Sequence, residues 1–367
     1  MKFICDGLDL TDAALTVSRA LPAKTTNPIL EGIKIIAKDD KVTLISTDLE
    51  LMIEKTIKAD VKVGGVIIVP GKFFTDYVKK LSNEQITLES VNDAQCKINY
   101  TDNVGYIQLL NSSEYPDIKK VDNDNYFEIN KQDLKETITK TIFAVAVDDS
   151  RPILKGCFFE ILKGDLTVVA LDGYRLALTK AKLINSTQDL SFVVPSKTLS
   201  EINKILDEVD GNIKLYYQKQ YIMLEIDGTI IISRLLDGEY LNYRQVINNN
   251  FESQVTVNKR QMEDALERTS LLARVEKNNL AKFDIKEHNL EITSNSEIGN
   301  IHENVTISLK GGDILTAFNA RYFVEALHAI DDEFITLNFT NNILPCVIKP
   351  VEGEKYLFLV LPVRAMN

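Results

Sequence analysis

A long internal repeat runs through the sequence. Residues 27–32 (NPILEG) are matched by residues 151–156 (RPILKG), a shift of 124 positions. The same shift, with no gap, takes Asp48 to Asp172. Solenoid repeats are roughly 20–50 residues long, so a period of this length indicates a whole domain. A domain copied along a chain is more typical of a scaffold than of an active site.

Two predicted helices recur in three copies of the repeat. The first is expected near residues 9–20, at Lys131–Phe143 and at Lys259–Ala273. The second is expected at Val69–Leu81, Val194–Leu206 and Phe318–Ile330. The third copy is the most diverged, and for it chance similarity of amphipathic helices stays open. Asn- and Asp-rich stretches separate the copies, and we expect domains near 1–122, 123–249 and 250–367.

Each copy also contains segments with strand-like alternation. They lie at residues 41–46, 165–170 and 289–293, and short turns such as Asp39-Asp40 and Lys163-Gly164 precede the first two. Strands joined by short turns pair antiparallel. The predicted fold class is therefore α+β, with three similar domains that each contain two helices and antiparallel sheets.

Composition limits the function classes. The net charge of −11 argues against a protein that coats nucleic acid, although an acidic surface can enclose one basic face. The four cysteines are far apart and form no CxxC pair, so we expect neither a disulfide framework nor a zinc site. Neither a signal-peptide pattern nor a membrane-length apolar run is visible, which predicts a soluble cytoplasmic protein.

Catalytic patterns are weak. Asp48 and Asp172 could be read as paired carboxylates, but Asp beside Gly at the end of a strand is a routine turn. The three histidines, His288, His302 and His328, have no second ligand at metal-binding spacing. The sequence contains no glycine-rich phosphate loop and no GxSxG nucleophile elbow. We expect no catalytic activity, no cofactor and no metal.

Several motifs together resemble one family. The PIL-x-G segments, the sequence DGYRL at Asp172–Leu176 and the sequence LPVR at Leu361–Arg364 lie on a triplicated chain. In that order and at that length they resemble the bacterial DNA polymerase III beta subunit, the sliding clamp family. The resemblance implies a head-to-tail homodimer that closes into a ring of six similar domains, with helices inside and sheets outside. A contact that closes into a ring also removes open sheet edges.

By this resemblance the ring encircles duplex DNA without sequence preference and confers processivity. It tethers the alpha subunit of the replicative polymerase, the clamp loader and other proteins that carry a clamp-binding motif. ATP use belongs to the separate loader. In the family an edge strand of the first domain meets the third domain of the partner. The matching positions here are Ile107 and the pair Leu271-Leu272, for which a place in the core of the helix is the alternative.

Basic residues on the predicted helices and loops would face DNA. Positions 80, 204 and 328 hold Lys, Lys and His at a constant spacing of 124, so a basic position is part of the repeat. For any single lysine, a solvated helix face is the alternative. The expected DNA-contacting residues are Lys24, Lys72, Lys79, Lys80, Lys135, Lys140, Arg151, Lys197, Lys204 and Arg321.

The family also binds a short partner peptide between its second and third domains. The matching residues are Leu154, Gly173, Tyr174, Arg175, Leu176, Leu241, Val246, Asn319, Tyr322, Pro345, Leu359, Leu361, Pro362, Val363 and Arg364. Leu154 and Leu359 could equally be ordinary core. The chain departs from the family pattern at Leu171, Leu241 and Gln245, and residues 365–367 extend beyond the usual end.

One rival function stays open at this point. A repeat adaptor could gather proteins through the same pocket without forming a ring or binding DNA. A strict monomer at micromolar concentration would favour the adaptor. The place where the repeat breaks its own pattern is also informative: residues 48–51 read DLEL, whereas residues 172–175 read DGYR. We expect partner binding at this break.

Overall fold

The computed structural model describes residues 1–111, 114–117, 121–122, 124–148, 150–206, 210–275 and 279–363. They form two compact units. The first unit combines Met1–Glu128 with Lys204–Leu235, and the second combines Ile129–Asn203 with Leu236–Asn367. No helix among these residues is both long and apolar enough to cross a membrane.

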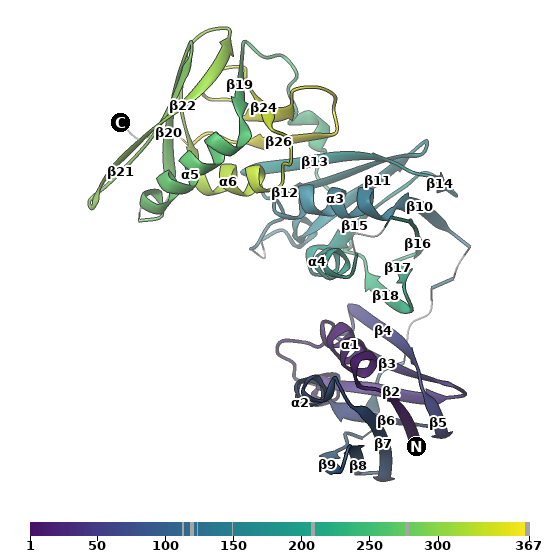
Figure 1. Cartoon of the computed structure of the whole chain (residues 1–367). Coiled ribbons are helices and arrows are strands. Elements are labelled where there is room, and N and C mark those ends of the chain that lie inside the picture. The colour runs from purple at the N-terminus through teal and green to yellow at the C-terminus, as the bar shows by residue number, and fades with distance from the viewer. Residues whose placement is uncertain are drawn as a thin grey trace. The chain divides into compact units, whose positions relative to one another are not determined.

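The first unit contains two helices and most of two sheets (Figure 1). Its helices are α1 (Gly7–Ser18) and α2 (Gly71–Val78). Its strands are β1 (Lys2–Asp6), β2 (Gly32–Lys38), β3 (Lys41–Thr47), β4 (Leu51–Lys58), β5 (Asp60–Val63), β6 (Gly65–Pro70), β7 (Gln85–Asn92), β8 (Gln95–Tyr100), β9 (Asn103–Gln108), β16 (Asn212–Gln218), β17 (Tyr221–Ile226) and β18 (Thr229–Arg234). Strand β10 (Tyr126–Asn130) lies where the ranges of the two units meet.

Strand pairing explains why the first unit is not one continuous stretch of chain. One sheet has the order β5-β1-β7-β8-β9, and a second contains the run β10-β16-β17-β18-β4-β3-β2-β6. Strand β18 pairs antiparallel with β4, with Ile231 opposite Ile53. Strands from the second repeat therefore complete a sheet of the first. Helices α1 and α2 pack through buried side chains such as Leu10, Val17 and Phe74.

The second unit contains the rest of the helices and one long sheet. Its helices are α3 (Lys131–Ile142), α4 (Ser196–Ile205, mostly within this unit), α5 (Lys259–Ala273) and α6 (Ala320–His328). Its strands are β11 (Gly156–Leu162), β12 (Asp165–Leu171), β13 (Arg175–Lys182), β14 (Asn185–Ser186), β15 (Leu190–Pro195), β19 (Ser253–Asn258), β20 (Leu280–Lys286), β21 (Asn289–Ser296), β22 (Gly299–Lys310), β23 (Ile314–Asn319), β24 (Phe334–Phe339), β25 (Cys346–Pro350) and β26 (Tyr356–Val360).

The long sheet of the second unit joins two repeats. Its twelve strands have the order β15-β11-β12-β13-β26-β25-β24-β19-β22-β21-β20-β23. The joint is the antiparallel pair β13–β26, with Ala177 opposite Phe358. Ala177 corresponds to Ile53 at the repeat shift of 124. The β13–β26 pair of this unit is therefore the counterpart of the β4–β18 pair of the first unit.

The predicted fold class, α+β with two helices in each repeat and antiparallel sheets, is confirmed. Each repeat supplies two helices, and every strand pair described is antiparallel. The first helix of each repeat begins after a residue whose side chain caps its amide groups: Asp6, Asn130 and Asn258. The second helix begins about two residues later than expected, because Val69-Pro70 ends strand β6 and Phe318-Asn319 ends β23. A residue before proline is disfavoured in a helix, and this moves the start of α2 past Pro70.

Candidate functional site

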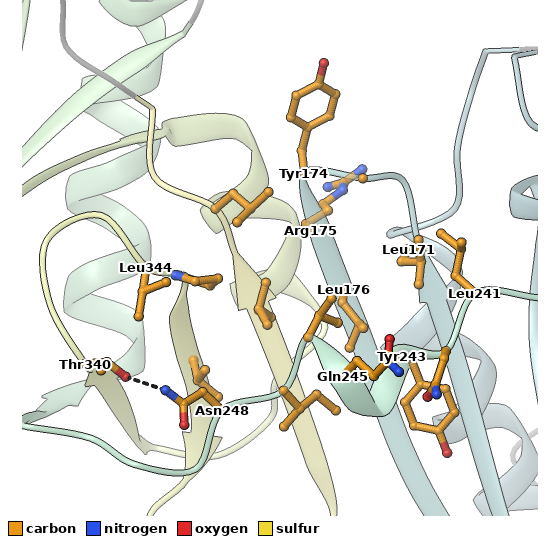
Figure 2. Close-up of a pocket in the computed structure, with 18 of the residues that line it drawn as sticks. Leu171, Tyr174, Arg175, Leu176, Leu241, Tyr243, Gln245, Asn248, Thr340 and Leu344 are labelled. Carbon is orange, nitrogen blue, oxygen red and sulfur yellow. Dashed lines mark hydrogen bonds between the residues drawn. The ribbon is translucent and has the colours of Figure 1, made fainter.

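A pocket of about 610 Å³, called here the second-unit pocket, opens where strands β12, β13, β25 and β26 end (Figure 2). Two loops, at 241–248 and 340–345, complete its walls. Its lining residues are Leu171, Gly173, Tyr174, Arg175, Leu176, Leu241, Asn242, Tyr243, Gln245, Val246, Ile247, Asn248, Phe251, Thr340, Leu344, Pro345, Val347, Leu359 and Leu361.

A tight turn between β12 and β13 shapes one wall. The Asp172 carboxylate accepts hydrogen bonds from the backbone N–H groups of Tyr174 (2.9 Å) and Arg175 (3.0 Å). Gly173 has φ +91°, a left-handed conformation that favours glycine. Asp48 accepts the corresponding bonds from Glu50 (3.0 Å) and Leu51 (2.7 Å). The two aspartates therefore build the same turn in two repeats, and the turn interpretation accounts for both.

The floor of the pocket is apolar. Leu171, Leu176 and Leu359 belong to one buried cluster, and Leu176 lies opposite Leu359 in the β13–β26 pair. Leu154 is buried in the same cluster beneath the lining. A floor of packed aliphatic side chains is suited to the apolar anchors of a bound peptide.

Arg175 is buried, and its charge is already paired. Its side chain is 6% exposed; Nε lies 3.1 Å from the Asp172 carboxylate, and one terminal nitrogen contacts Glu325. The guanidinium also lies 4.6 Å from the centre of the Tyr322 ring. Arg175 thus holds the turn against α6 and is not free to bind a carboxylate of a partner.

Glu325 shows the electrostatic effect of this arrangement. Burial by itself raises its pKa, but hydrogen bonds from Arg321 and Arg175 outweigh burial and hold the pKa below its ordinary value. Glu325 therefore stays ionised near neutral pH. Arg321 lies on the solvent side of the same carboxylate, with an N–O distance of 2.6 Å.

The rim of the pocket is more exposed. Tyr174 stacks on Tyr322 with ring centres 6.2 Å apart. The backbone N–H of Leu361 donates to the Tyr174 carbonyl at 2.9 Å, and that of Val363 donates to the Ala317 carbonyl at 2.8 Å. Across the mouth, Asn248 donates to Thr340 at 3.2 Å (Figure 2). The rim combines aromatic and amide groups around the apolar floor.

The structure brings most of the predicted pocket residues together. Those on the lining are Gly173, Tyr174, Arg175, Leu176, Leu241, Val246, Pro345, Leu359 and Leu361. Leu154 lies in the core below, Asn319 caps α6, Tyr322 supports Tyr174 and Arg175, and Pro362 and Val363 follow the lining at the chain end. Arg364 and residues 365–367 lie outside the described residues.

Sequence reasoning missed part of the lining. The residues not proposed are Asn242, Tyr243, Ile247, Asn248, Phe251, Thr340, Leu344 and Val347, while Leu171 and Gln245 were noted only as departures. Val347 could have been found from strand alternation, because it lies opposite Leu359 in the β25–β26 pair. The loop residues carry no local signal, since their position depends on how two distant loops fold together.

The expected DNA-contacting residues fall into three classes. Exposed side chains in the first unit are Lys24, Lys72, Lys79, Lys80 and Lys204, and those in the second unit are Arg151, Lys197 and Arg321. Lys135 is half-buried. Lys140 is buried; its ammonium contacts Glu136, lies 3.7 Å from Asp331 and stands over the Tyr356 ring. We therefore remove Lys140 from the proposed DNA-facing set, because an interior ion pair cannot reach a phosphate.

The expected dimer residues differ in exposure. Ile107 on β9 is 4% exposed, so its side chain packs within its own unit. Leu272 is buried in helix α5, as the helix-core alternative requires, whereas Leu271 is 65% exposed. Strand β9 ends its sheet, and its exposed apolar residues are Val104 and Tyr106, which sequence reasoning did not single out.

The described residues offer no metal centre. They contain no group of three or more His, Cys, Asp or Glu side chains placed to hold an ion. All four cysteines are buried and unpaired. Burial raises the pKa of the Cys96 thiol to about 11, which keeps it protonated near neutral pH.

Family models match three successive stretches of the chain. Three models of the DNA polymerase III beta subunit match in order: the N-terminal domain over residues 1–119, the central domain over 128–242 and the C-terminal domain over 244–364. A beta sliding clamp of Staphylococcus epidermidis is 32% identical over 356 residues, which is 94% of each chain.

Solved structures agree with these matches. The DNA polymerase sliding clamp of Bacillus subtilis superposes with a TM-score of 0.96 at 31% identity, over 100% of both chains. A putative DNA polymerase III beta subunit of Eubacterium rectale superposes with a TM-score of 0.94 at 33% identity, over 99% of this chain and 100% of that one. The fold is therefore the three-domain clamp fold, and the chain belongs to the DNA polymerase III beta subunit family, the beta sliding clamps.

Proposed function

We propose that this protein is a DNA sliding clamp, a non-catalytic processivity factor of bacterial replication. Two copies would close head to tail around duplex DNA and tether the replicative polymerase. Curated relatives named beta sliding clamp support the general role. One observation carries the proposal of a ring. Two strand edges are open among the described residues, although the corresponding edges in other copies of the repeat are paired with a neighbouring strand. A role in replication would place the protein in the bacterial cytoplasm.

The first open edge is strand β9. The β8–β9 hairpin matches the β17–β18 hairpin: Tyr100 lies opposite Asn103 in one, and Ile226 opposite Thr229 in the other, a shift of 126. Strand β18 uses its outer edge to pair with β4. Strand β9 has the same outer edge, but it ends its sheet without a further partner among the described strands.

The second open edge is the first part of β22. Residues 299–306 pair with β21 on one side, and only residues 307–310 pair with β19 on the other. The counterparts of this part of β22 are β4, at a shift of 248, and β13, at a shift of 124. On the second side, β4 pairs with β18 and β13 pairs with β26. An open edge of this kind is a template for another strand. A second copy of the chain supplies one, namely β9.

The repeat register fixes the proposed pairing. Ile231 lies opposite Ile53, and the counterparts of these two residues are Gly105 and Ile301. Gly105 would therefore lie opposite the partner's Ile301, and Val104 opposite the partner's His302. Because this contact joins different surfaces, it generates a closed ring if the rotation closes.

Cysteine cross-linking tests this register. A chain with Val104→Cys and His302→Cys should form a disulfide-linked dimer on mild oxidation, since directly opposed Cβ atoms lie about 4.5–5.5 Å apart. The matched control pairs Val104→Cys with Asn304→Cys, whose diagonal separation of about 7–8 Å should slow the reaction strongly. The native cysteines are buried and give little background. Equal yields from both pairs, or a strict monomer in sedimentation, would contradict the ring and favour the adaptor.

The exposed basic residues support the DNA part of the proposal. Phosphate attraction is sequence-independent and weakens with salt, so retention on DNA would come from topological linkage. The loaded clamp should stay on nicked circular DNA and leave once the DNA is cut. Reversing Lys72, Lys79 and Lys197 to glutamate should shorten its lifetime on circles at low salt. Lys282→Glu, an exposed lysine on strand β20, is a single-site control and should have no effect. Equal loss from circular and linear DNA would mean ordinary binding.

We assign the second-unit pocket to clamp-binding peptides of the polymerase alpha subunit, the clamp loader and other replication and repair proteins. Its apolar floor and amide-lined rim support this assignment. Deletion of residues 361–367, or Leu241→Lys at the rim, should abolish stimulation of the polymerase while the cross-linked dimer still forms. Leu162→Lys, an exposed leucine of β11 outside the pocket, is the control. Full stimulation by the rim variant would refute the assignment.

A further inference from the structure

We propose that the first unit carries a second peptide-docking site, which accepts a short segment with an apolar anchor and adjacent lysine or arginine residues. A pocket of about 240 Å³, called here the first-unit pocket, lies between the 47–52 turn and strand β18. Buried Met52, Tyr115 and Ile232 form its floor. Leu49, Glu50 and Asp117 form its exposed rim.

The first-unit pocket is the repeat copy of the second-unit pocket. Its 47–52 turn corresponds to the 171–176 turn at a shift of 124. Ile232 lies opposite Met52 in the β4–β18 pair, as Leu359 lies opposite Leu176 in the β13–β26 pair. Tyr115 donates to the Ile45 carbonyl at 3.2 Å, and Tyr240 donates to the Val169 carbonyl at 3.4 Å. The scaffold of a peptide groove is therefore present twice.

The two pockets share a backbone scaffold but carry different residues at the rim. Leu49 replaces Gly173 and holds φ +78°, a conformation that is unusual for leucine. Its side chain is nevertheless 59% exposed. A strained backbone that presents an apolar side chain to solvent costs free energy and is concentrated at ligand-binding sites. Leu49 would cover the anchor of a bound segment.

The charge of the rim selects the occupant. Glu50 stands at the position of Tyr174, and Asp117 at that of Asn242. Neither carboxylate makes a side-chain hydrogen bond or ion pair with the described residues, and the turn has Leu51 where the other has Arg175. Two exposed carboxylates beside an apolar floor complement a basic, partly apolar peptide and repel nucleic acid. The smaller volume fits one or two anchor side chains.

Methionine methyl NMR on the full-length protein tests the site directly. The chain has five methionines, and Met52 lies in the floor of the first-unit pocket, while none of the described methionines lines the second-unit pocket. The probe is a capped heptapeptide with adjacent leucine and phenylalanine preceded by two lysines. Its control has two glutamates instead of the lysines. The Met52 signal, assigned with Met52→Leu, should shift with the lysine peptide at about tenfold lower concentration than with the glutamate peptide.

Variants separate docking from general attraction. Glu50→Lys with Asp117→Lys should reverse the preference between the two peptides. Asp40→Lys with Asp93→Lys changes the charge equally in the same unit, outside the pocket, and should leave the preference intact. Leu49→Gly should weaken the Met52 response without lowering the unfolding temperature. An unmoved Met52 signal, or equal effects of the two double variants, would overturn the proposal. A change in sedimentation with Glu50→Lys would identify a second copy as the occupant and also overturn it.

Discussion

The two pockets share a backbone but differ in how charge is placed on it. In both, an aspartate closes the turn, a strand pair supplies the floor and a tyrosine hydroxyl bonds the same carbonyl position. In the second-unit pocket, Arg175 neutralises Asp172 and Glu325 from inside. In the first-unit pocket, Leu51 takes that place and acidic groups stay at the rim. The repeat thus fixes shape, while the rim residues, Glu50 and Asp117 above all, set which partner we expect the shape to accept.

The largest effect on this comparison should come from Arg175→Met. It removes a buried cation, which leaves Asp172 without its ion-pair partner and Glu325 with Arg321 alone, and it should cost about 3 kcal/mol of unfolding free energy. Arg321→Met is the matched control, because Arg321 pairs with the same Glu325 but is 61% exposed. Loss of that exposed pair should cost less than about 1 kcal/mol. Urea unfolding, followed by circular dichroism, measures the unfolding free energy of both variants. Equal losses of unfolding free energy would show that the burial of Arg175 does not distinguish the second-unit pocket from the first-unit pocket.

Acid should affect the two units in opposite directions. In the second unit, burial favours a raised pKa of Glu325, but hydrogen bonds from Arg321 and Arg175 outweigh burial and hold this pKa below its ordinary value. The stability it contributes is present above that value and is lost as the pH falls through the lowered pKa. In the first unit, burial and then the charge of Glu225 raise the pKa of Glu54. Its contribution is present below the ordinary pKa and is lost as the pH rises through the raised value.

Hydrogen exchange read by mass spectrometry reports on each unit separately and checks these signs. As the pH falls below about 5, towards the lowered pKa of Glu325, protection should fall first in the second unit. Glu54→Gln should make the first unit less dependent on pH, and Arg175→Met should do the same for the second. A parallel loss in both units, unchanged by either variant, would contradict the assignment of these carboxylates.

Removing the tyrosine hydroxyl that each pocket uses to hold a strand carbonyl should lower stability by smaller and unequal amounts. Tyr115→Phe removes a buried 3.2 Å hydrogen bond to the Ile45 carbonyl and should cost about 1 kcal/mol. Tyr240→Phe removes a longer, 3.4 Å bond to Val169 and should cost about half as much. Thermal unfolding of the two variants ranks them. The reverse order would mean that the two pockets do not rely on this bond in the same way.

The sequence predicted local features better than distant contacts. The helices, the Asp172 turn and the repeat follow from spacing and capping within a few residues, and all are observed. Lys140 was misplaced because its ammonium lies against the buried Tyr356 ring, which lies far along the chain. The first-unit pocket was not proposed either, although the match between Asp48 and Asp172 pointed to it. The proposed difference in partner lies in residues 49–51 and at Asp117, where the two copies carry different residues and spacing gives no guide.

Substitutions at the two turn residues, Gly173 and Leu49, should change stability little and test whether shape or charge sets partner choice. Gly173→Ala meets no atom within 4 Å, so its cost is only the left-handed backbone, about 1 kcal/mol. Leu49→Gly relieves the same strain but adds the entropy of glycine, so the net change should stay within about 0.5 kcal/mol. If shape alone sets partner choice, Gly173→Leu would give the second-unit pocket the peptide preference of the first-unit pocket. We expect it to weaken binding without changing that preference, because Glu50 and Asp117 have no acidic counterparts at positions 174 and 242.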